Sequence, residues 1–543
     1  MVATIAGGFW ADRQRLNREV LLPEGHRQLE AAGNLHDLRA AAGRADGPFR
    51  GPVYIDSDLH KWLEAVGWEL AREPSPELAA VAGEVIELLA AAQDDDGYLN
   101  TCYQLTRPRS ERFTNLAWDH ELYCGGHLIE AAVADDDERL LGVAERFAEH
   151  AATAPVPDGH PEIELALVAL ARRTGERRWV DLARRFLDER GHGRLQPAHW
   201  GADYFQDGVP LREQHEVVGH AVRALYLAAA MVDVAVETGD AALLEAAVAQ
   251  WEDMALRKAY LTGAVGSRHD GEAFGDPYEL PPDACYGETC ASIASVLFSW
   301  RLLQATGAAR YADQIERTLY NGFAAGVALD GSGYFYVNPL QVDGPGTRRH
   351  AWYGCACCPP NVMRLLASLG RYMATYDDGG VQLHQYATGT FGPVRVETDY
   401  PWDGRIAVTA LADTTCALRV PAWAAGASLV PGYTRVELRD GETVVLDLPV
   451  KPRLTTADPR VAAVRGCVAI ERGPLVYCFE GDDLGDLALT GDVHDVHRPD
   501  LLGGIVAVEA GGRLAIPYAL WANRESTGMR VWTPMSSPSV IVT

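Results

Sequence analysis

Two short segments of the 543-residue chain hold most of its unusual chemistry. One is YGETC at residues 286–290, and the other is CACCPPN at residues 355–361. Each is followed by apolar residues at helical spacing, and Pro359 and Pro360 suit a first helical turn. We therefore expect both segments to lie where a loop enters a helix. The oriented N–H groups of a helix start favour thiolate over thiol, which makes a sulfur a better metal ligand and nucleophile.

Glu288, Cys290, Cys357 and Cys358 could together bind a zinc ion. Three thiolates and one carboxylate form a four-coordinate set that zinc accepts in tetrahedral geometry. Adjacent cysteines and a Glu-x-Cys pair differ from the usual zinc-finger spacing, so the pattern alone leaves open that these thiols are small buried apolar groups. Ten cysteines are sparse for a disulfide scaffold of this length, and we expect thiols or metal ligands.

Further side chains could contact a substrate. Glu272 lies in the Gly-rich segment GSRHDGEAFGD, where a carboxyl could serve as general acid or be an ordinary solvated loop carboxylate. His127 and His220 each follow a glycine near the start of an apolar helical run, where a packed core histidine is the alternative. Tyr336, in GYFYVNPL, is either a pocket residue or a buried strand aromatic.

The elements that must position these residues are mainly helices up to about residue 376. Apolar residues recur there at helical spacing among good helix formers, as in SPELAAVAGEVIELLAAAQ, where Ser75 is a candidate N-cap and Pro76 the first helical residue. Twelve segments fit this pattern: 11–32, 57–71, 75–93, 117–134, 136–151, 159–174, 177–189, 214–237, 240–259, 286–305, 308–326 and 358–376.

The arrangement of these segments indicates a helical barrel followed by β structure. Several pairs have very short links and are typical of αα-hairpins, and six hairpins would close an (α/α)6 barrel, although an open solenoid gives the same pattern. After about residue 380, short alternating runs with Asp-Gly and Gly-Gly turns predict antiparallel strands. The expected fold class is therefore α + β multidomain: an (α/α)6 barrel over 1–380, then a β-sandwich region over 381–543 with one main sandwich and a small second sheet.

Composition excludes some classes of partner. The formal charge is 48 − 75 = −27, which argues against binding to a nucleic-acid backbone. No run of 18 or more uncharged apolar residues predicts a membrane span, and the first residues lack the pattern of a secretory signal. A cytoplasmic location is therefore the expectation.

Several motifs resemble the bacterial β-L-arabinofuranosidase family of retaining glycoside hydrolases. They occur in the same order from about residue 120 to 525 and are the segments HELYCGGHLIEAA, VVGHAVRALYLAAA, GEAFGDPYELPPDACYGETCASIAS, FYVNPL, CACCPPNVMRL, ETDYPWDGR, LRVPAW, RGPLVYCFEG and IPYALWANR. The resemblance implies an (α/α)6 catalytic barrel, a β-sandwich region, and a zinc-bound cysteine in place of the usual second carboxylate.

Matching the motifs residue by residue gives roles to the candidate side chains. The resemblance implies that Cys357 is the nucleophile and Glu272 the general acid/base. It further implies that the zinc ligands are Glu288, Cys290, Cys357 and Cys358, and that the substrate-binding residues are His127, His220 and Tyr336.

The leading hypothesis is a retaining exo-acting enzyme that releases terminal β-L-arabinofuranose from oligosaccharides or glycoconjugates. One alternative is a related glycosidase for another furanose or a branched deoxypentose. A second is an inverting glycosidase, lyase or epimerase, since (α/α)6 barrels host these reactions without a catalytic cysteine. A third is a non-catalytic carbohydrate-binding protein with a structural zinc. The expected partner is a small carbohydrate, and a homodimer is a further expectation.

Overall fold

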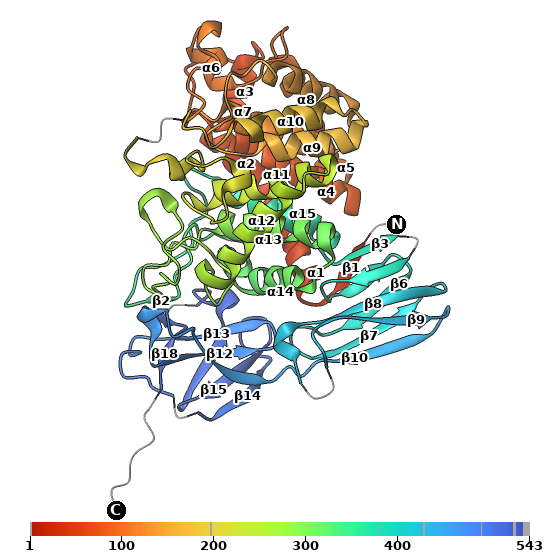
Figure 1. The fold of residues 1–543 in the computed structure, drawn as a ribbon, viewed down its shortest axis with the longest axis vertical. Coiled ribbons are helices and arrows are strands. Elements are labelled where there is room, and N and C mark those ends of the chain that lie inside the picture. The colour runs from red at the N-terminus through yellow and green to blue at the C-terminus, as the bar shows by residue number, and fades with distance from the viewer. Residues whose placement is uncertain are drawn as a thin grey trace, which may run out of the picture. The chain divides into compact units, whose positions relative to one another are not determined.

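The structure is a computed structural model that describes residues 3–195, 198–377, 379–426, 429–489, 491–524 and 528–535. Within these residues, helices dominate up to Tyr372 and strands dominate from Ala374 onward (Figure 1). The predicted order, a helix-rich part followed by antiparallel sheets, is therefore confirmed. In the described part of the chain, no helix combines the length and the apolar character that a membrane span requires.

Each predicted helical segment contains an α-helix, and in the described residues two short α-helices, α3 and α6, lie outside the predicted ranges. The helices are α1 (Gly8–Leu16), α2 (Leu22–Ala32), α3 (Asn34–Ala41), α4 (Asp56–Arg72), α5 (Pro76–Ala92), α6 (Thr101–Thr106), α7 (Glu121–Ala134), α8 (Glu138–Ala151), α9 (Ile163–Thr174), α10 (Arg178–Glu189), α11 (Ala221–Thr238), α12 (Ala241–Asp253), α13 (Thr289–Thr306), α14 (Ala309–Arg317) and α15 (Cys358–Ser368).

Local sequence explains where these helices begin. The Ser75 hydroxyl accepts the Leu78 N–H at 3.3 Å, with Pro76 as the first residue of α5, as predicted. Helix α6 begins in the same way, because the Asn100 side chain accepts the Tyr103 N–H at 3.1 Å. With only six residues, α6 carries too little periodic pattern to be recognised from the sequence.

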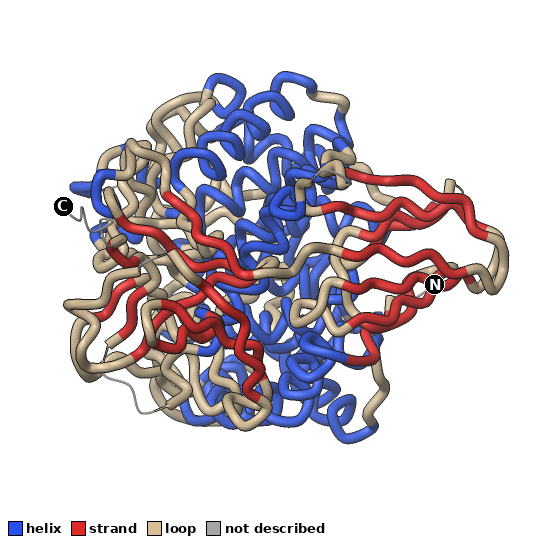
Figure 2. The backbone as a smooth tube through the Cα atoms, turned by 90° about the horizontal axis from the view of Figure 1, so that it is seen from below, coloured by secondary structure: helices blue, strands red, loops and turns tan. Residues whose placement is uncertain are grey.

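Within the described residues the strands form three sheets, drawn in red in Figure 2. Their bounds are β1 (Thr4–Gly7), β2 (Gln341–Val342), β3 (Ala374–Asp377), β4 (Gly380–Leu383), β5 (Thr388–Phe391), β6 (Val394–Thr398), β7 (Arg405–Ala410), β8 (Thr414–Val420), β9 (Gly432–Leu438), β10 (Thr443–Asp447), β11 (Pro452–Thr456), β12 (Cys467–Arg472), β13 (Leu475–Glu480), β14 (Val493–Arg498), β15 (Ile505–Ala510), β16 (Arg513–Pro517), β17 (Met529–Arg530) and β18 (Thr533–Pro534).

Each sheet combines strands that are neighbours in the chain with strands from distant segments. A five-stranded sheet runs β1-β5-β6-β7-β10, and a four-stranded sheet runs β3-β4-β8-β9. A nine-stranded sheet is built on β11-β12-β13-β16-β15-β14, with β17, β18 and β2 paired beside it. The pairs are antiparallel except for β4 with β8. Alternation explains the burial: in β7, Ile406, Val408 and Ala410 are buried while the residues between them are not.

The described chain also divides into two compact units. One comprises Met1–Arg15, Met254–Ala351 and Leu369–Thr543, and the other comprises Leu16–Asp253 and Trp352–Ser368. The second unit is helical and holds α4, α7, α9, α11 and α15. The domain boundary expected near residue 380 stays a prediction.

The start of α7 contains a buried carboxyl with a shifted pKa. Glu121 has no exposed surface, and it accepts the Phe113 N–H at 2.9 Å and the Tyr98 hydroxyl. Burial raises the pKa of Glu121 to about 7, although these hydrogen bonds oppose the shift. The folded protein therefore holds this proton more tightly than the unfolded chain does, so the contribution to stability is present at low pH and lost as the pH rises through 7.

We therefore expect Glu121→Gln, which cannot titrate, to weaken the fall in stability that the wild type undergoes between pH 4.5 and 7.5. Urea unfolding midpoints at several pH values, followed by circular dichroism, measure this. Glu111→Gln, at an exposed position, is the matched control and should keep the wild-type pH dependence. Identical profiles for Glu121→Gln and the wild type would contradict the assignment.

Candidate functional site

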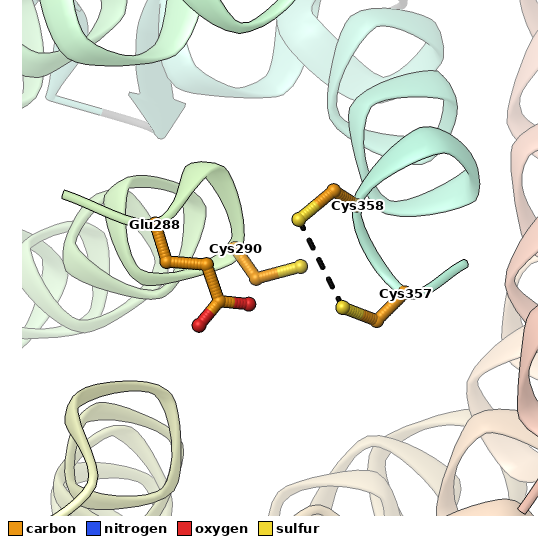
Figure 3. Close-up of side chains that lie close together, drawn as sticks. All are labelled: Glu288, Cys290, Cys357 and Cys358. Atoms are coloured by element: carbon orange, nitrogen blue, oxygen red, sulfur yellow. Dashed lines mark hydrogen bonds between the residues drawn. The ribbon is translucent and has the colours of Figure 1, made fainter. Parts of the chain in front are cut away.

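The sulfur atoms of three cysteines meet beside one carboxylate. One ligand atom each from Glu288, Cys290, Cys357 and Cys358 lies within 4.8 Å of every other (Figure 3). Glu288 immediately precedes α13 and Cys290 is in its first turn, while Cys358 begins α15 and Cys357 precedes it. The expectation that both segments lie where a loop enters a helix is therefore correct.

The spacing of the sulfurs suits a tetrahedral metal ion. Sγ of Cys357 lies 3.8 Å from Sγ of Cys358. Two sulfurs bound to one tetrahedral zinc, each at about 2.3 Å, are separated by about 3.8 Å. Together with one carboxylate, this donor set has the number and softness of ligands that zinc takes. The four side chains could therefore hold a metal ion, and the set is compatible with zinc.

Burial distinguishes the four side chains. Glu288 and Cys290 are each 2% exposed and Cys358 is fully buried, whereas Cys357 is partly exposed. Among these three thiols, Cys357 is thus the one that a molecule from solvent can reach.

Glu272 and His220 lie next to this cluster. One ligand atom each from His220, Glu272 and Glu288 again lies within 4.8 Å of the others, so Glu288 belongs to both groups. Glu272 is partly exposed and sits in a tight turn, where its N–H donates to the His269 carbonyl at 3.2 Å. The Glu272 backbone has a left-handed conformation, with φ 51°. This conformation is uncommon for residues other than glycine, and the residues that adopt it are often found at functional sites.

Tyr336 is tied to the same segment through its backbone. Its carbonyl accepts the Thr289 N–H at 3.0 Å, and the Asn338 side chain donates to the Gly287 carbonyl at 2.8 Å. The Tyr336 ring is partly exposed, with its centroid 6.3 Å from that of Tyr286. The segment FYVNPL therefore braces the turn that presents Glu288 and Cys290.

His127, the other predicted sugar contact, has a different environment. It lies within α7 with no exposed surface, and its Nδ1 is 3.0 Å from Oε1 of Glu162. Burial and the nearby cations Lys61 and Arg364 hold its pKa well below the ordinary value. Its potential ligand group contains Glu64 and Glu130, not Glu288.

Sequence reasoning missed two histidines near His220. The ring of His160 lies 6.1 Å from that of His220 and 5.8 Å from that of His120. Both are almost buried, and His120 has a left-handed φ of 57° directly before α7. Each closes a loop just before a helix, and this position is the signal that could have identified them.

Cys355 also adjoins the cluster. Its hydrogen bond to Cys357 and its burial raise the pKa of the Cys355 thiol far above the ordinary value. The Tyr54 hydroxyl is a second hydrogen-bond partner of this thiol. Cys355 therefore lies in hydrogen-bond contact with the accessible sulfur, a position that the motif pattern left without a role.

Comparisons with known proteins agree with this architecture. A family model described as β-L-arabinofuranosidase, glycoside hydrolase family 127 catalytic domain, matches residues 3–371, and the family's C-terminal domain model matches residues 452–534. A non-reducing end β-L-arabinofuranosidase from Bifidobacterium longum subsp. longum is 36% identical, and the alignment covers 94% of each chain.

Solved structures match along nearly the whole chain. A family 127 β-L-arabinofuranosidase from Geobacillus stearothermophilus T6 superposes with a TM-score of 0.93 at 36% identity, covering 98% of this chain and 100% of that one. A further family 127 β-arabinofuranosidase gives a TM-score of 0.91 at 32% identity, covering 98% of this chain and 96% of that one. The resemblance inferred from the motifs is confirmed, and the chain belongs to glycoside hydrolase family 127, the β-L-arabinofuranosidase family.

Proposed function

We propose that the protein is a retaining, exo-acting β-L-arabinofuranosidase that uses Cys357 as nucleophile and Glu272 as general acid/base. The observation that carries the proposal is one accessible thiol within an otherwise buried group of side chains that could hold a metal ion, with the Glu272 carboxyl beside the same Glu288. The names of the relatives support the substrate, since they are arabinofuranosidases, one of them specified as acting at the non-reducing end.

Glu288, Cys290, Cys357 and Cys358 would hold the zinc ion. When bound, zinc lowers the pKa of its thiol ligands and so supplies thiolate at neutral pH. Three thiolates and one carboxylate carry −4, so the bound group would have a net charge of −4 + 2 = −2. This excess of negative charge keeps the Cys357 sulfur electron-rich enough to attack carbon.

The reaction then proceeds in two displacements. The Cys357 sulfur bonds to the anomeric carbon, the bond from that carbon to the leaving oxygen breaks, and Glu272 gives its proton to that oxygen. In the second step Glu272 takes a proton from water, the water oxygen bonds to the anomeric carbon, and the carbon–sulfur bond breaks. Two inversions at one carbon give net retention.

His220 and Tyr336 are proposed to hold the sugar, because both can exchange hydrogen bonds with hydroxyls. His220 lies beside Glu272, and the Tyr336 backbone is bonded to the start of α13. His160 and His120 extend this histidine group through their ring contacts. The predicted sugar contact of His127 stays a prediction, and its full burial means that neighbouring side chains would have to move for it to form.

A panel of nitrophenyl glycosides tests the substrate. We expect the β-L-arabinofuranoside to be turned over fastest, with NMR detecting the β-anomer as the first-formed product because the mechanism retains configuration. Faster turnover of another furanoside or a branched deoxypentoside would move the assignment to a related glycosidase. First-formed α-anomer would instead indicate inversion, and sugar binding without turnover would indicate a carbohydrate-binding protein.

Substitutions at the two reacting residues should have different effects. Cys357→Ala should reduce kcat about 10⁴-fold or more, because the covalent step is lost, while Cys467→Ala, at another partly exposed thiol, should leave it unchanged.

Glu272→Ala should reduce kcat about 10²- to 10⁴-fold, with partial rescue by azide, which needs no general base. Asp270→Asn in the same loop is the control. Wild-type turnover by Cys357→Ala would contradict the mechanism.

Metal removal provides a separate check. We expect elemental analysis to find about one zinc per chain, since the four-ligand set is complete for one tetrahedral ion. Dialysis against a chelator should abolish activity, and added zinc should restore it. Cys290→Ser should lower the zinc content, because a hydroxyl is a poorer ligand than a thiolate. Full activity of a zinc-free preparation would rule out the proposed role of the metal.

A further inference from the structure

A buried arginine lies on α15, the helix that begins at Cys358. Arg364 in α15 is 4% exposed, and its Nη1 lies 2.8 Å from Oε2 of Glu64 in α4 and 2.7 Å from Oε2 of Glu130 in α7. Glu64, His127 and Glu130 are close enough to suggest a metal site. The guanidinium already occupies the position between the two carboxylates, so the cation of this group is Arg364 itself.

The same guanidinium is connected to the first turn of its own helix. Nε donates to Oδ1 of Asn361 at 2.6 Å, and Nη2 donates to the Tyr226 hydroxyl at 2.9 Å. The side-chain NH₂ group of Asn361 donates to that hydroxyl at 3.2 Å. The backbone N–H of Asn361 donates to the Cys357 carbonyl at 3.4 Å. Two short steps thus connect Arg364 to the backbone of Cys357.

Three glutamates surround the Arg364 guanidinium. It faces the carboxyl groups of Glu64 and Glu130 at hydrogen-bond distance, with Glu162 farther away at 4.0 Å. Burial and the neighbouring Glu130 raise the pKa of Glu162, and burial lowers the pKa of His127, whose Nδ1 lies 3.0 Å from Oε1 of Glu162. A planar fork with five donors can serve all these partners at once, whereas an ammonium cannot.

We propose that Arg364 is a positioning residue for the reaction: its bonds to α4, α7 and α11 fix the rotation of α15 and thereby the direction of the Cys357 and Cys358 sulfurs. This inference rests on the proposed function of those thiols. Arg364 lies six residues after Cys358, roughly 9 Å along the helix axis, so it would act on the sulfurs through the helix and not by direct contact. Rotation of the helix about its axis would turn both sulfurs together, which makes this anchor decisive for their geometry.

The test compares Arg364→Lys with the wild type as the full-length, zinc-loaded protein. We expect zinc affinity, measured by competition with a chromogenic chelator, to fall about 10- to 100-fold, as it does when the partners of metal ligands are removed. We also expect kcat to fall by a similar factor with little change in KM, because the substrate-binding side chains are retained. The rate at which iodoacetamide alkylates Cys357, followed by peptide mass spectrometry, should also differ between Arg364→Lys and the wild type, because the direction of the Cys357 sulfur changes.

Arg419→Lys is the matched control, because Arg419 is also fully buried and paired with two carboxylates, those of Asp313 and Glu316, but lies in β8. A general effect of losing a buried guanidinium would lower stability in both variants, whereas the inference requires the zinc and alkylation effects only in Arg364→Lys. Equal effects in the two variants, or wild-type zinc affinity in Arg364→Lys, would overturn it.

Tyr226→Phe keeps the test decisive even if Arg364→Lys fails to fold. This change removes only the hydroxyl that accepts from both Arg364 and Asn361, so we expect a smaller loss of zinc affinity, about 3- to 10-fold. Unchanged zinc affinity in a folded Tyr226→Phe protein would overturn the inference. Zinc binding and alkylation do not depend on the glycoside, so absence of furanosidase activity would defeat the proposed function while leaving this result interpretable.

Discussion

The site depends on one electrostatic constraint: four side chains that become negatively charged on ionisation lie close together. Three thiols and a carboxyl within 4.8 Å cannot all be ionised in a largely buried place unless a cation compensates them. The Sγ atoms of Cys357 and Cys358 are 3.8 Å apart, which is the separation expected for two sulfurs bound to one tetrahedral ion. Without that ion, burial would favour protonated thiols, which are poor nucleophiles. The metal and the nucleophile are therefore parts of one proposal.

The scaffold presents these ligands from two helix starts. At one, the turn before α13 is braced by Asn338 and by the backbone of Tyr336. At the other, α15 is held by a buried network around Arg364. Functional groups placed on such rigid elements keep their geometry better than groups on free loops. Glu272 is different, because it lies on a strained turn that directs its carboxyl toward Glu288 and His220.

The sequence was sufficient for the architecture where periodic patterns are long. The Ser75 cap, the long helices and the change from helices to strands all follow from local propensity and alternation. The change comes slightly earlier than the expected residue 380, because β3 already begins at Ala374. The short helices α3 and α6 were not predicted, because so few residues show too little of the helical hydrophobic period. Strand pairing was equally beyond reach: β1, at the N-terminal end, pairs with β5 almost 400 residues later, through contacts that no local motif encodes.

For the site, chemistry was easier to predict than direction. The sequence placed four candidate metal ligands in two segments at helix starts, and the structure brings their ligand atoms together. The role of Glu272 came from the resemblance of its motif and stays a prediction. A glycine before a histidine, by contrast, does not say which way the imidazole points. His220 and His127 share this local pattern but have different surroundings: His220 lies beside Glu272, whereas His127 is buried against Glu162. His160 and His120 join His220 only through the tertiary fold.

The most direct test of the central claim is to trap the covalent intermediate. The zinc-loaded enzyme would be incubated with an L-arabinofuranose-configured epoxide or haloacetamide, digested, and analysed by peptide mass spectrometry. The account predicts one adduct per chain, on Cys357, and none after the zinc has been removed. An adduct on Glu272 or Glu288 with Cys357 unmodified, or equal labelling of the zinc-free protein, would contradict it.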